Sequence, residues 1–337
     1  IPNYFYFEEA AFSHFPAIKE LNNRIRTRTG NTNEMVIWLN YELFNVHVPY
    51  YYQNNWFGAD KLLQYLHHDF GLNTIVMGSY ALQGFTSGSG ISYHPTTLST
   101  SGYNVNANIF SYPASPGFYD THLQLQLDNI YASGTSLTYV YKLMSELSKS
   151  GMRIINCPQA HSWYNEIHHI LKEPSNEEIE LQACLALTYN AKGILYFSYI
   201  SVPSDRAFGI LNADGSKRTN SAYGQNKYEG IKSIDIKLSK WAPYVMSFDP
   251  QHTKSCVYRL SDERNQFTAN SYFDEVRTEL QNPQTQCAEI VPNTSYENPN
   301  NTYVQAATFK PINEPFTNYF MLLNRRCSPG DDDCSGR

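Results

Sequence analysis

Strand-like and helix-like segments alternate along the first two thirds of the chain, and this alternation constrains the fold more than any other feature. Apolar runs suited to buried strands are separated by amphipathic stretches with helical spacing. Repeated strand–helix units predict a parallel sheet with helices outside it, because parallel neighbours need a crossover connection. The expected strands are residues 4–7, 35–40, 73–77, 152–156 and 193–199.

Cap and stop signals locate the helices between these strands. Ser13 can cap the first helix and Gly30 can stop it, while Ser175 and Glu178 form the capping box of a later one. Residues 118–131 fit either a helix or a strand, with the helix favoured. The other expected helices are 59–70, 137–149, a segment from Ser175 through Leu187, and 225–240, the last ending before Pro243.

Five strand–helix units are fewer than the eight of a closed (β/α)8 barrel. The predicted fold class is α/β, with a partial TIM-type barrel over residues 1–245. The three missing units would precede Ile1, or another chain completes the barrel, or the sheet is an open one. After Pro250 helical periodicity gives way to short strand-like runs at 255–258 and 318–323, which predicts a β-rich, partial β-sandwich-like domain over 250–337.

Two segments resemble the barrels of glycoside hydrolases. Tyr4–Ala10, sequence YFYFEEA, resembles the acidic end of the fourth barrel strand in several such families. Residues 158–163, 173–179 and 191–199 resemble the seventh strand, seventh helix and eighth strand, in that order. Asn324-Arg325-Arg326 resembles the start of a β-sandwich that follows such barrels. The resemblance implies a protein that acts on carbohydrate, with its site at the carboxyl ends of the strands.

Glu8 and Glu9 are the candidate catalytic residues, because they end the first strand at that edge. Hydrolysis of a glycosidic bond usually needs one carboxyl group to protonate the leaving oxygen and another as nucleophile or base. Glu9 is the better candidate for the general acid. The alternative is a solvated pair of acids at the start of a helix, where the helix dipole favours negative charge.

The second carboxylate is missing from its expected place, since the segment after residues 152–156 reads Pro158-Gln159-Ala160-His161. One remedy is a substrate-assisted mechanism on N-acetylated sugars, in which the substrate's own acetamido group attacks and adjacent acids on one strand suffice. The resemblance implies an Asp-Glu pair for that mechanism, and Glu8 stands where the Asp would be. The other remedy is a catalytically silent barrel that binds glycans or serves as a surface or assembly component.

Several further side chains are candidates for substrate binding or catalysis. Asp128 is a reserve acid if its segment is a strand. Amides and imidazoles can bond to sugar hydroxyls, and aromatic rings can stack on sugar C–H bonds, although packing at a strand end explains such residues equally well. The candidates for substrate binding are Gln159, His161, Trp163, Tyr199 and Asn40.

Composition narrows the choice of partners. Charged residues make up 17% of the chain and the net charge is −6, which argues against a nucleic-acid partner, whereas the 27 tyrosines suit a neutral polar ligand. No apolar run reaches the ~18 residues of a membrane span. The sequence carries no metal or nucleotide motif, and Asp331-Asp332-Asp333 reads as a solvated loop, so no cofactor is expected.

The six cysteines favour an extracellular or cell-surface location. Cys327 and Cys334 flank a turn-rich loop that a disulfide can close, and Cys256 and Cys287 are a second possible pair. Cys157 and Cys184 lie in an apolar strand and helix, where they are expected as buried thiols.

Overall fold

The computed structural model describes the chain in segments, and all structural statements concern these. They are residues 4–10, 14–30, 34–39, 50–52, 55–57, 67–77, 83–85, 94–95, 98–99, 102–103, 110–111, 141, 144–145, 147–164, 169–171, 173–205, 207–220, 224–259, 302–314 and 316–324.

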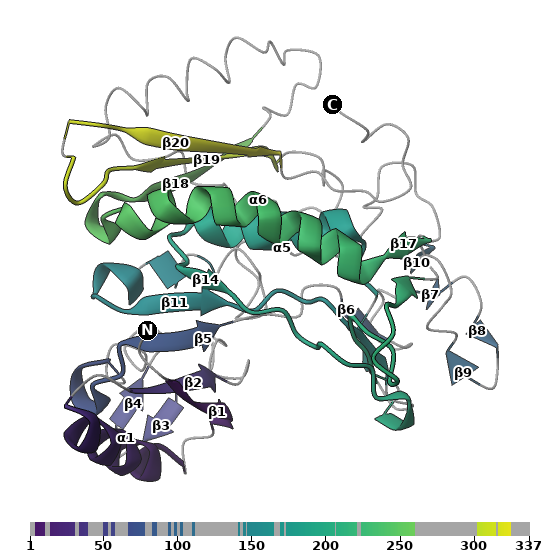
Figure 1. The fold of residues 1–337 in the computed structure, drawn as a ribbon, viewed down its shortest axis with the longest axis horizontal. Helices are drawn as coiled ribbons and strands as arrows, with labels where there is room; N and C mark the ends of the chain where they lie inside the picture. Colours follow the sequence, from purple (N-terminus) through teal and green to yellow (C-terminus); the bar gives the residue numbers. More distant parts are fainter. Residues whose placement is uncertain are drawn as a thin grey trace.

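A five-stranded parallel sheet forms the centre of the molecule (Figure 1). Each strand pairs in parallel with the next one along the chain, so the spatial order is the order in sequence. All five expected strands are therefore confirmed as neighbours in one sheet. They are β1 (Tyr4–Ala10), β2 (Glu34–Leu39), β5 (Thr74–Met77), β11 (Arg153–Asn156) and β14 (Gly193–Ile194).

Strand β14 is shorter than the expected 193–199, but its pairing with the preceding strand continues beyond it. Leu195 donates its N–H to the Asn156 carbonyl at 2.8 Å, and Gln159 and Phe197 form an isolated parallel bridge. The segment after β14 thus stays beside the segment after β11. It includes a cis peptide bond between Phe197 and Ser198.

Two helices begin and end largely where the sequence indicated. Helix α1 (Phe15–Thr29) stops at Gly30, whose φ of 61° is the left-handed conformation that glycine favours, and His14 takes the N-cap position assigned to Ser13. The Asn22 side chain connects α1 to its neighbours, accepting from the Met35 N–H and donating to the Phe70 carbonyl. Helix α5 (Asn176–Thr188) starts at the Ser175–Glu178 capping box, as predicted.

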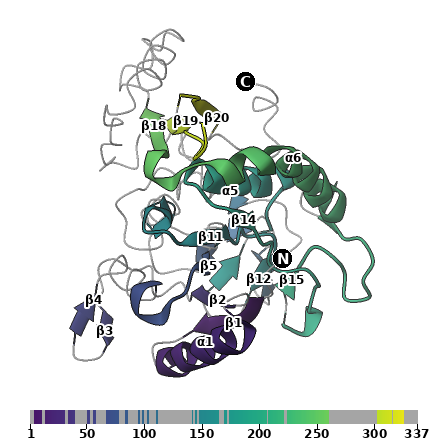
Figure 2. The ribbon, with the colours of Figure 1, turned by 60° about the vertical axis from the view of Figure 1, so that its left-hand side comes forward.

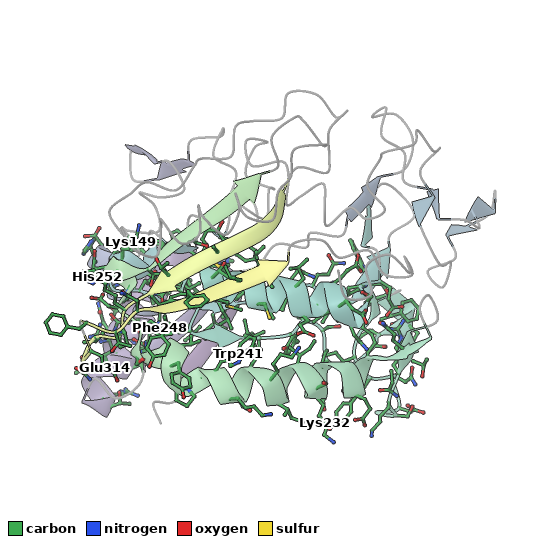
Figure 3. The ribbon with its side chains drawn as sticks, turned by 90° about the horizontal axis from the view of Figure 1, so that it is seen from above. Lys149, Lys232, Trp241, Phe248, His252 and Glu314 are labelled. Carbon is green, nitrogen blue, oxygen red and sulfur yellow. The ribbon has the colours of Figure 1, made fainter. Side chains whose placement is uncertain are left out.

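Helix α6 (Lys227–Ser247) runs past Pro243, so the prediction that it ends near residue 240 was wrong. A proline inside a helix removes one backbone hydrogen bond, and tertiary contacts hold the last turn here. The Lys192 ammonium donates to the carbonyls of Val245 (2.6 Å) and Phe248 (3.2 Å). Burial lowers the pKa of Lys192 to about 8. Figure 3 shows Phe248 where this end of α6 meets the last strands.

Most of the short antiparallel strands lie beyond the carboxyl ends of the parallel sheet, whereas β3 (Tyr50–Tyr52) and β4 (Asn55–Phe57) lie near α1 (Figure 1). Four of them form one sheet in the order β15 (Ala207–Phe208), β12 (Ser162–Tyr164), β13 (His169–Leu171) and β6 (Gln83–Phe85). The others form two-stranded pairs: β3 with β4, β7 (His94–Pro95) with β10 (Phe110–Ser111), β8 (Leu98–Ser99) with β9 (Gly102–Tyr103), and β16 (Thr219–Asn220) with β17 (Gln225–Asn226). Single 3-10 turns, η3 (Pro203–Asp205) and η4 (Pro250–His252), complete the connections.

A three-stranded antiparallel sheet follows α6, in the order β18 (Lys254–Arg259), β19 (Thr302–Phe309) and β20 (Tyr319–Asn324). The expected strand runs at 255–258 and 318–323 are confirmed within β18 and β20, whereas β19 was not anticipated. The sheet lies over α5 and α6 (Figures 1 and 2), and Phe309 stacks on Phe248 with ring centroids 4.5 Å apart. The division into domains near residue 250 stays a prediction.

Within the described segments, none of the helices has the length and hydropathy that a membrane crossing requires. Cys157 and Cys184 are buried thiols, as expected. Of the other four cysteines, Cys256 lies in β18 with its side chain undescribed, and Cys287, Cys327 and Cys334 lie outside the described residues.

Candidate functional site

The carboxyl ends of β1, β11 and β14 bring the predicted site residues to one edge of the sheet, because parallel strands all end on the same side. Glu8 and Glu9 belong to β1, Gln159 and His161 follow β11, and Tyr199 follows β14. Asn40 and Asp128 lie outside the described residues, so their roles stay predictions.

The pairing of β1 with β2 is irregular at Glu8 and Glu9. Phe7 pairs with Ile37 and Ala10 pairs with Leu39, so β1 has one residue more than β2 between these two pairs. Such a bulge breaks the strict alternation of side chains and re-aims them, and bulges are frequent beside active sites. No local sequence signal indicated this bulge. It means that a simple alternation does not decide which of the two acids faces the sheet's end.

Gln159 and His161 are buried, and their polar atoms bond to the protein itself. The Gln159 side-chain amide donates to the His161 carbonyl at 3.2 Å, and the Gln159 N–H donates to Oε1 of Gln182 at 3.1 Å. His161 Nδ1 lies 2.9 Å from the Phe197 carbonyl. A carbonyl only accepts, so Nδ1 carries the proton. These contacts hold the segments after β11 and β14 together.

Burial lowers the pKa of His161 to about 4, because the apolar surroundings disfavour a charged ring. The Phe197 carbonyl opposes this shift by favouring the protonated form, and its effect is smaller. The Phe197 ring also packs edge-on against the imidazole, with centroids 5.0 Å apart. His161 is therefore a neutral histidine at physiological pH.

The two predicted stacking residues differ in accessibility. Trp163 lies within β12 and is partly buried between β13 and β15. The Tyr199 side chain is 56% exposed, while the Tyr199 carbonyl accepts from the Leu211 N–H at 2.8 Å. A fixed backbone with an open ring suits Tyr199 to stacking on a ligand.

A buried ion cluster of Glu173, Arg218 and Lys227 lies beside these residues, and sequence reasoning missed it. Both Arg218 guanidinium nitrogens bind the Glu173 carboxylate, one of them at 2.5 Å, in a bidentate pair. Lys227 Nζ lies 3.3 Å from the same carboxylate and donates to the Pro174 carbonyl at 3.1 Å. Burial lowers the pKa of Lys227 to about 8, and the Glu173 charge opposes that shift.

This cluster decides the role of the acids near the ends of β11 and β14. Glu173 is neutralised by two cations, and the Glu178 side chain accepts from the Ser175 N–H in the capping box. Both carboxylates are thus engaged by groups of the protein itself. The absence of a second catalytic acid at this end of the sheet stays a prediction.

The cluster joins residues about 50 positions apart, and this is why no local signal revealed it. Arg and Lys side chains are rarely buried unless paired, which is consistent with the burial of both cations against Glu173. Among the described residues, no group of three or more His, Cys, Asp and Glu side chains is arranged to hold a metal ion.

Comparison with known proteins does not assign this chain to a family. No family model matches the sequence, and no curated protein matches it. A solved structure, the β-galactosidase from the psychrophilic Marinomonas ef1, is similar at a TM-score of 0.39 and 14% identity over 71% of this chain. The chain spans about 29% of the length of that β-galactosidase.

The buried ion cluster makes Arg218 a sensitive position. We expect Arg218→Met to lower the free energy of unfolding by about 3 kcal/mol, because it strips a buried carboxylate of its bidentate partner. Urea unfolding followed by circular dichroism measures this. The neighbouring Lys217 pairs with Glu229 on the surface, so Lys217→Met is the control and should leave the midpoint nearly unchanged. Equal effects of the two variants would contradict the structural role of the cluster.

His161 predicts a pH dependence of stability. Its folded pKa is lowered, so the unfolded chain takes up the proton first and stability is lost as the pH falls from 6.5 to 4, by about 3 kcal/mol in all. Urea unfolding at several pH values in this range measures the loss. His161→Gln should flatten that part of the profile, whereas the exposed His252→Gln should not. If His161→Gln left the pH profile of stability unchanged, the loss of stability between pH 6.5 and 4 could not be due to His161.

Proposed function

We propose that this chain is a glycoside hydrolase-like protein that binds carbohydrate at the carboxyl ends of its parallel strands. The observation that carries the proposal is the exposed Tyr199 ring after β14, at the same end of the sheet as the acidic bulge of β1; β1 and β14 are the first and last strands of that sheet. An aromatic face and a pair of carboxylates are the groups that a sugar site requires. Asn40 is proposed beside them, with Trp163 as a second ring, while the buried Gln159 and His161, bonded within the protein, position the segment after β11.

The proposed architecture is an arc of a (β/α) barrel. The five strands follow one another without a reversal, whereas doubly wound sheets change direction at a switch point. Parallel strands are normally buried on both faces, and β5 is, but Leu195 just beyond β14 is 41% exposed. The exposed Leu195 side chain is apolar surface that further structure would cover, and we propose a further parallel strand beside β14, from elsewhere in the polypeptide or from another chain.

For catalysis we propose the substrate-assisted route on N-acetylated sugars, with Glu9 as general acid and Glu8 beside it. This route needs acids on one strand only, and it fits the engagement of Glu173 and Glu178 elsewhere. An extracellular or cell-surface location is proposed with it, since glycan substrates are abundant there.

A second candidate function, glycan binding without hydrolysis, is favoured by the same engagement of Glu173. In that case the acids of β1 contact sugar hydroxyls, and the barrel serves recognition or assembly. The two candidates share a binding site and differ only in turnover.

Binding at this edge is tested with Tyr199→Ala. Loss of a stacking ring should weaken binding of N-acetylhexosamine oligomers by about 3- to 10-fold, as measured by isothermal titration calorimetry. Tyr244→Ala is the matched control, because Tyr244 is 51% exposed and lies on α6, away from this edge. Absence of oligomer binding by the wild type, or equal weakening by both variants, would exclude the site.

Hydrolysis is tested with Glu9→Gln on aryl N-acetylhexosaminides. Removal of the general acid should lower kcat by about 10²- to 10⁴-fold. Glu180→Gln, on α5 and paired with Lys237, is the control that should keep wild-type turnover. Equal turnover by Glu9→Gln and the wild type would refute the role of Glu9, and a wild type that binds oligomers without cleaving them would support the second candidate.

A further inference from the structure

Strand β20 is an edge of the C-terminal sheet, and one of its faces is already occupied. In the described part of the chain it pairs only with β19. Tyr319 and Met321 point toward the end of α6, where they pack with Phe248 and Val245. Successive residues of a strand face opposite ways, so Phe320 and Leu322 lie on the outer face.

The outer face is apolar and partly uncovered. Phe320 is paired with Thr308 of β19, and Leu322 is paired with Ala306. Both β19 residues are buried, whereas Phe320 is 59% exposed and Leu322 is 43% exposed. The uncovered apolar side chains are thus concentrated on the edge strand and not on the middle strand. Phe316, in the turn before β20, is 98% exposed.

The edge lacks the features that normally prevent strand addition. Proteins protect exposed edges with charged residues, especially Lys, with Pro or with bulges. The sequence of β20 is Tyr-Phe-Met-Leu-Leu-Asn and that of β19 is Thr-Tyr-Val-Gln-Ala-Ala-Thr-Phe, without a charge in either. The ladder between them is regular over six consecutive pairs, without a bulge.

We propose that β20 pairs in antiparallel fashion with β20 of a second copy of this chain, about a two-fold axis. An antiparallel edge matches its own copy, because each strand offers the same row of N–H and C=O groups to the other. An uncharged strand meets its copy without like-charge repulsion, so self-pairing needs no complementary partner. This proposal is independent of the carbohydrate site.

The faces of the two sheets fix the register. Outer-face residues must lie opposite outer-face residues, because a slip by one residue would turn Phe320 and Leu322 inward. The register that pairs the two exposed side chains is centred on Met321. It sets Phe320 of each copy opposite Leu322 of the other, so two apolar cross-strand pairs form.

A pair of charge variants tests both the surface and the register. Phe320→Glu alone and Leu322→Lys alone should each raise the dimer dissociation constant at least tenfold in sedimentation equilibrium. An equimolar mixture of the two should regain dimer, because one cross-strand pair then joins opposite charges and the other remains Phe320 with Leu322. Leu21→Lys, at an exposed leucine on α1, is the control that should keep the wild-type constant.

The outcomes decide the proposal. Circular dichroism and thermal unfolding first confirm that the exposed substitutions leave the fold intact. A wild type that is monomeric up to about 100 µM would overturn the proposal, as would a dimer that both single variants leave unchanged. A mixture no more dimeric than its separate components would overturn the antiparallel register centred on Met321.

Discussion

Parallel pairing of consecutive strands is the constraint on which the rest of the structure depends. Each strand must be followed by a crossover, so helices and loops alternate between the same two ends of the sheet. Both faces of such a sheet are normally covered, and the strands are therefore mostly apolar, as in Thr74–Met77, which is buried at every position. All carboxyl ends lie on one side of the sheet, so Glu8, His161 and Tyr199, which are distant in sequence, lie at the same end of it.

At the carboxyl ends of the parallel strands, buried polar groups need hydrogen-bond or ionic partners within the protein. The chain supplies these partners in two ways. Around Gln159 and His161, neutral side chains bond to backbone groups, and the histidine stays uncharged because it is buried. Around Glu173, two cations surround one carboxylate. A buried ion pair contributes little net stability compared with apolar packing, but removal of one partner is costly. The cluster therefore fixes the positions of the loops more than it stabilises the fold.

Local signals were enough to predict most of the parallel sheet and its helices. The five strands, the Gly30 stop and the Ser175–Glu178 capping box each depend on residues close in sequence. Helix α6 shows the limit, since Pro243 is a sound local stop signal that contacts from Lys192 and Phe309 override. Strand β19 was missed because Gln305-Ala306-Ala307 at its centre has weak strand propensity, although the residues on either side favour strands; its two neighbouring strands supply the pairing.

The sequence was enough to predict which residues lie at the candidate site, but not whether their polar atoms are already hydrogen-bonded within the protein. A sequence can place Gln159 and His161 after a strand, but only the packing of Phe197 and Gln182 shows that their polar atoms are engaged. The Glu173 cluster and the β1 bulge depend on partners in other segments, so no local pattern carries them.

Among the described strands, the edge strands β14 and β20 differ in the kind of strand that can pair with them. Beside β14 the sheet is parallel, so a further parallel strand that follows directly in the same chain has to arrive through a crossover connection. Beside β20 the sheet is antiparallel, and a bare strand of a second copy is sufficient. Continuing the parallel sheet within one chain therefore requires a crossover unit, whereas pairing at β20 requires only a strand. For this reason the parallel edge bears on the completeness of the proposed barrel, and the antiparallel edge bears on self-association.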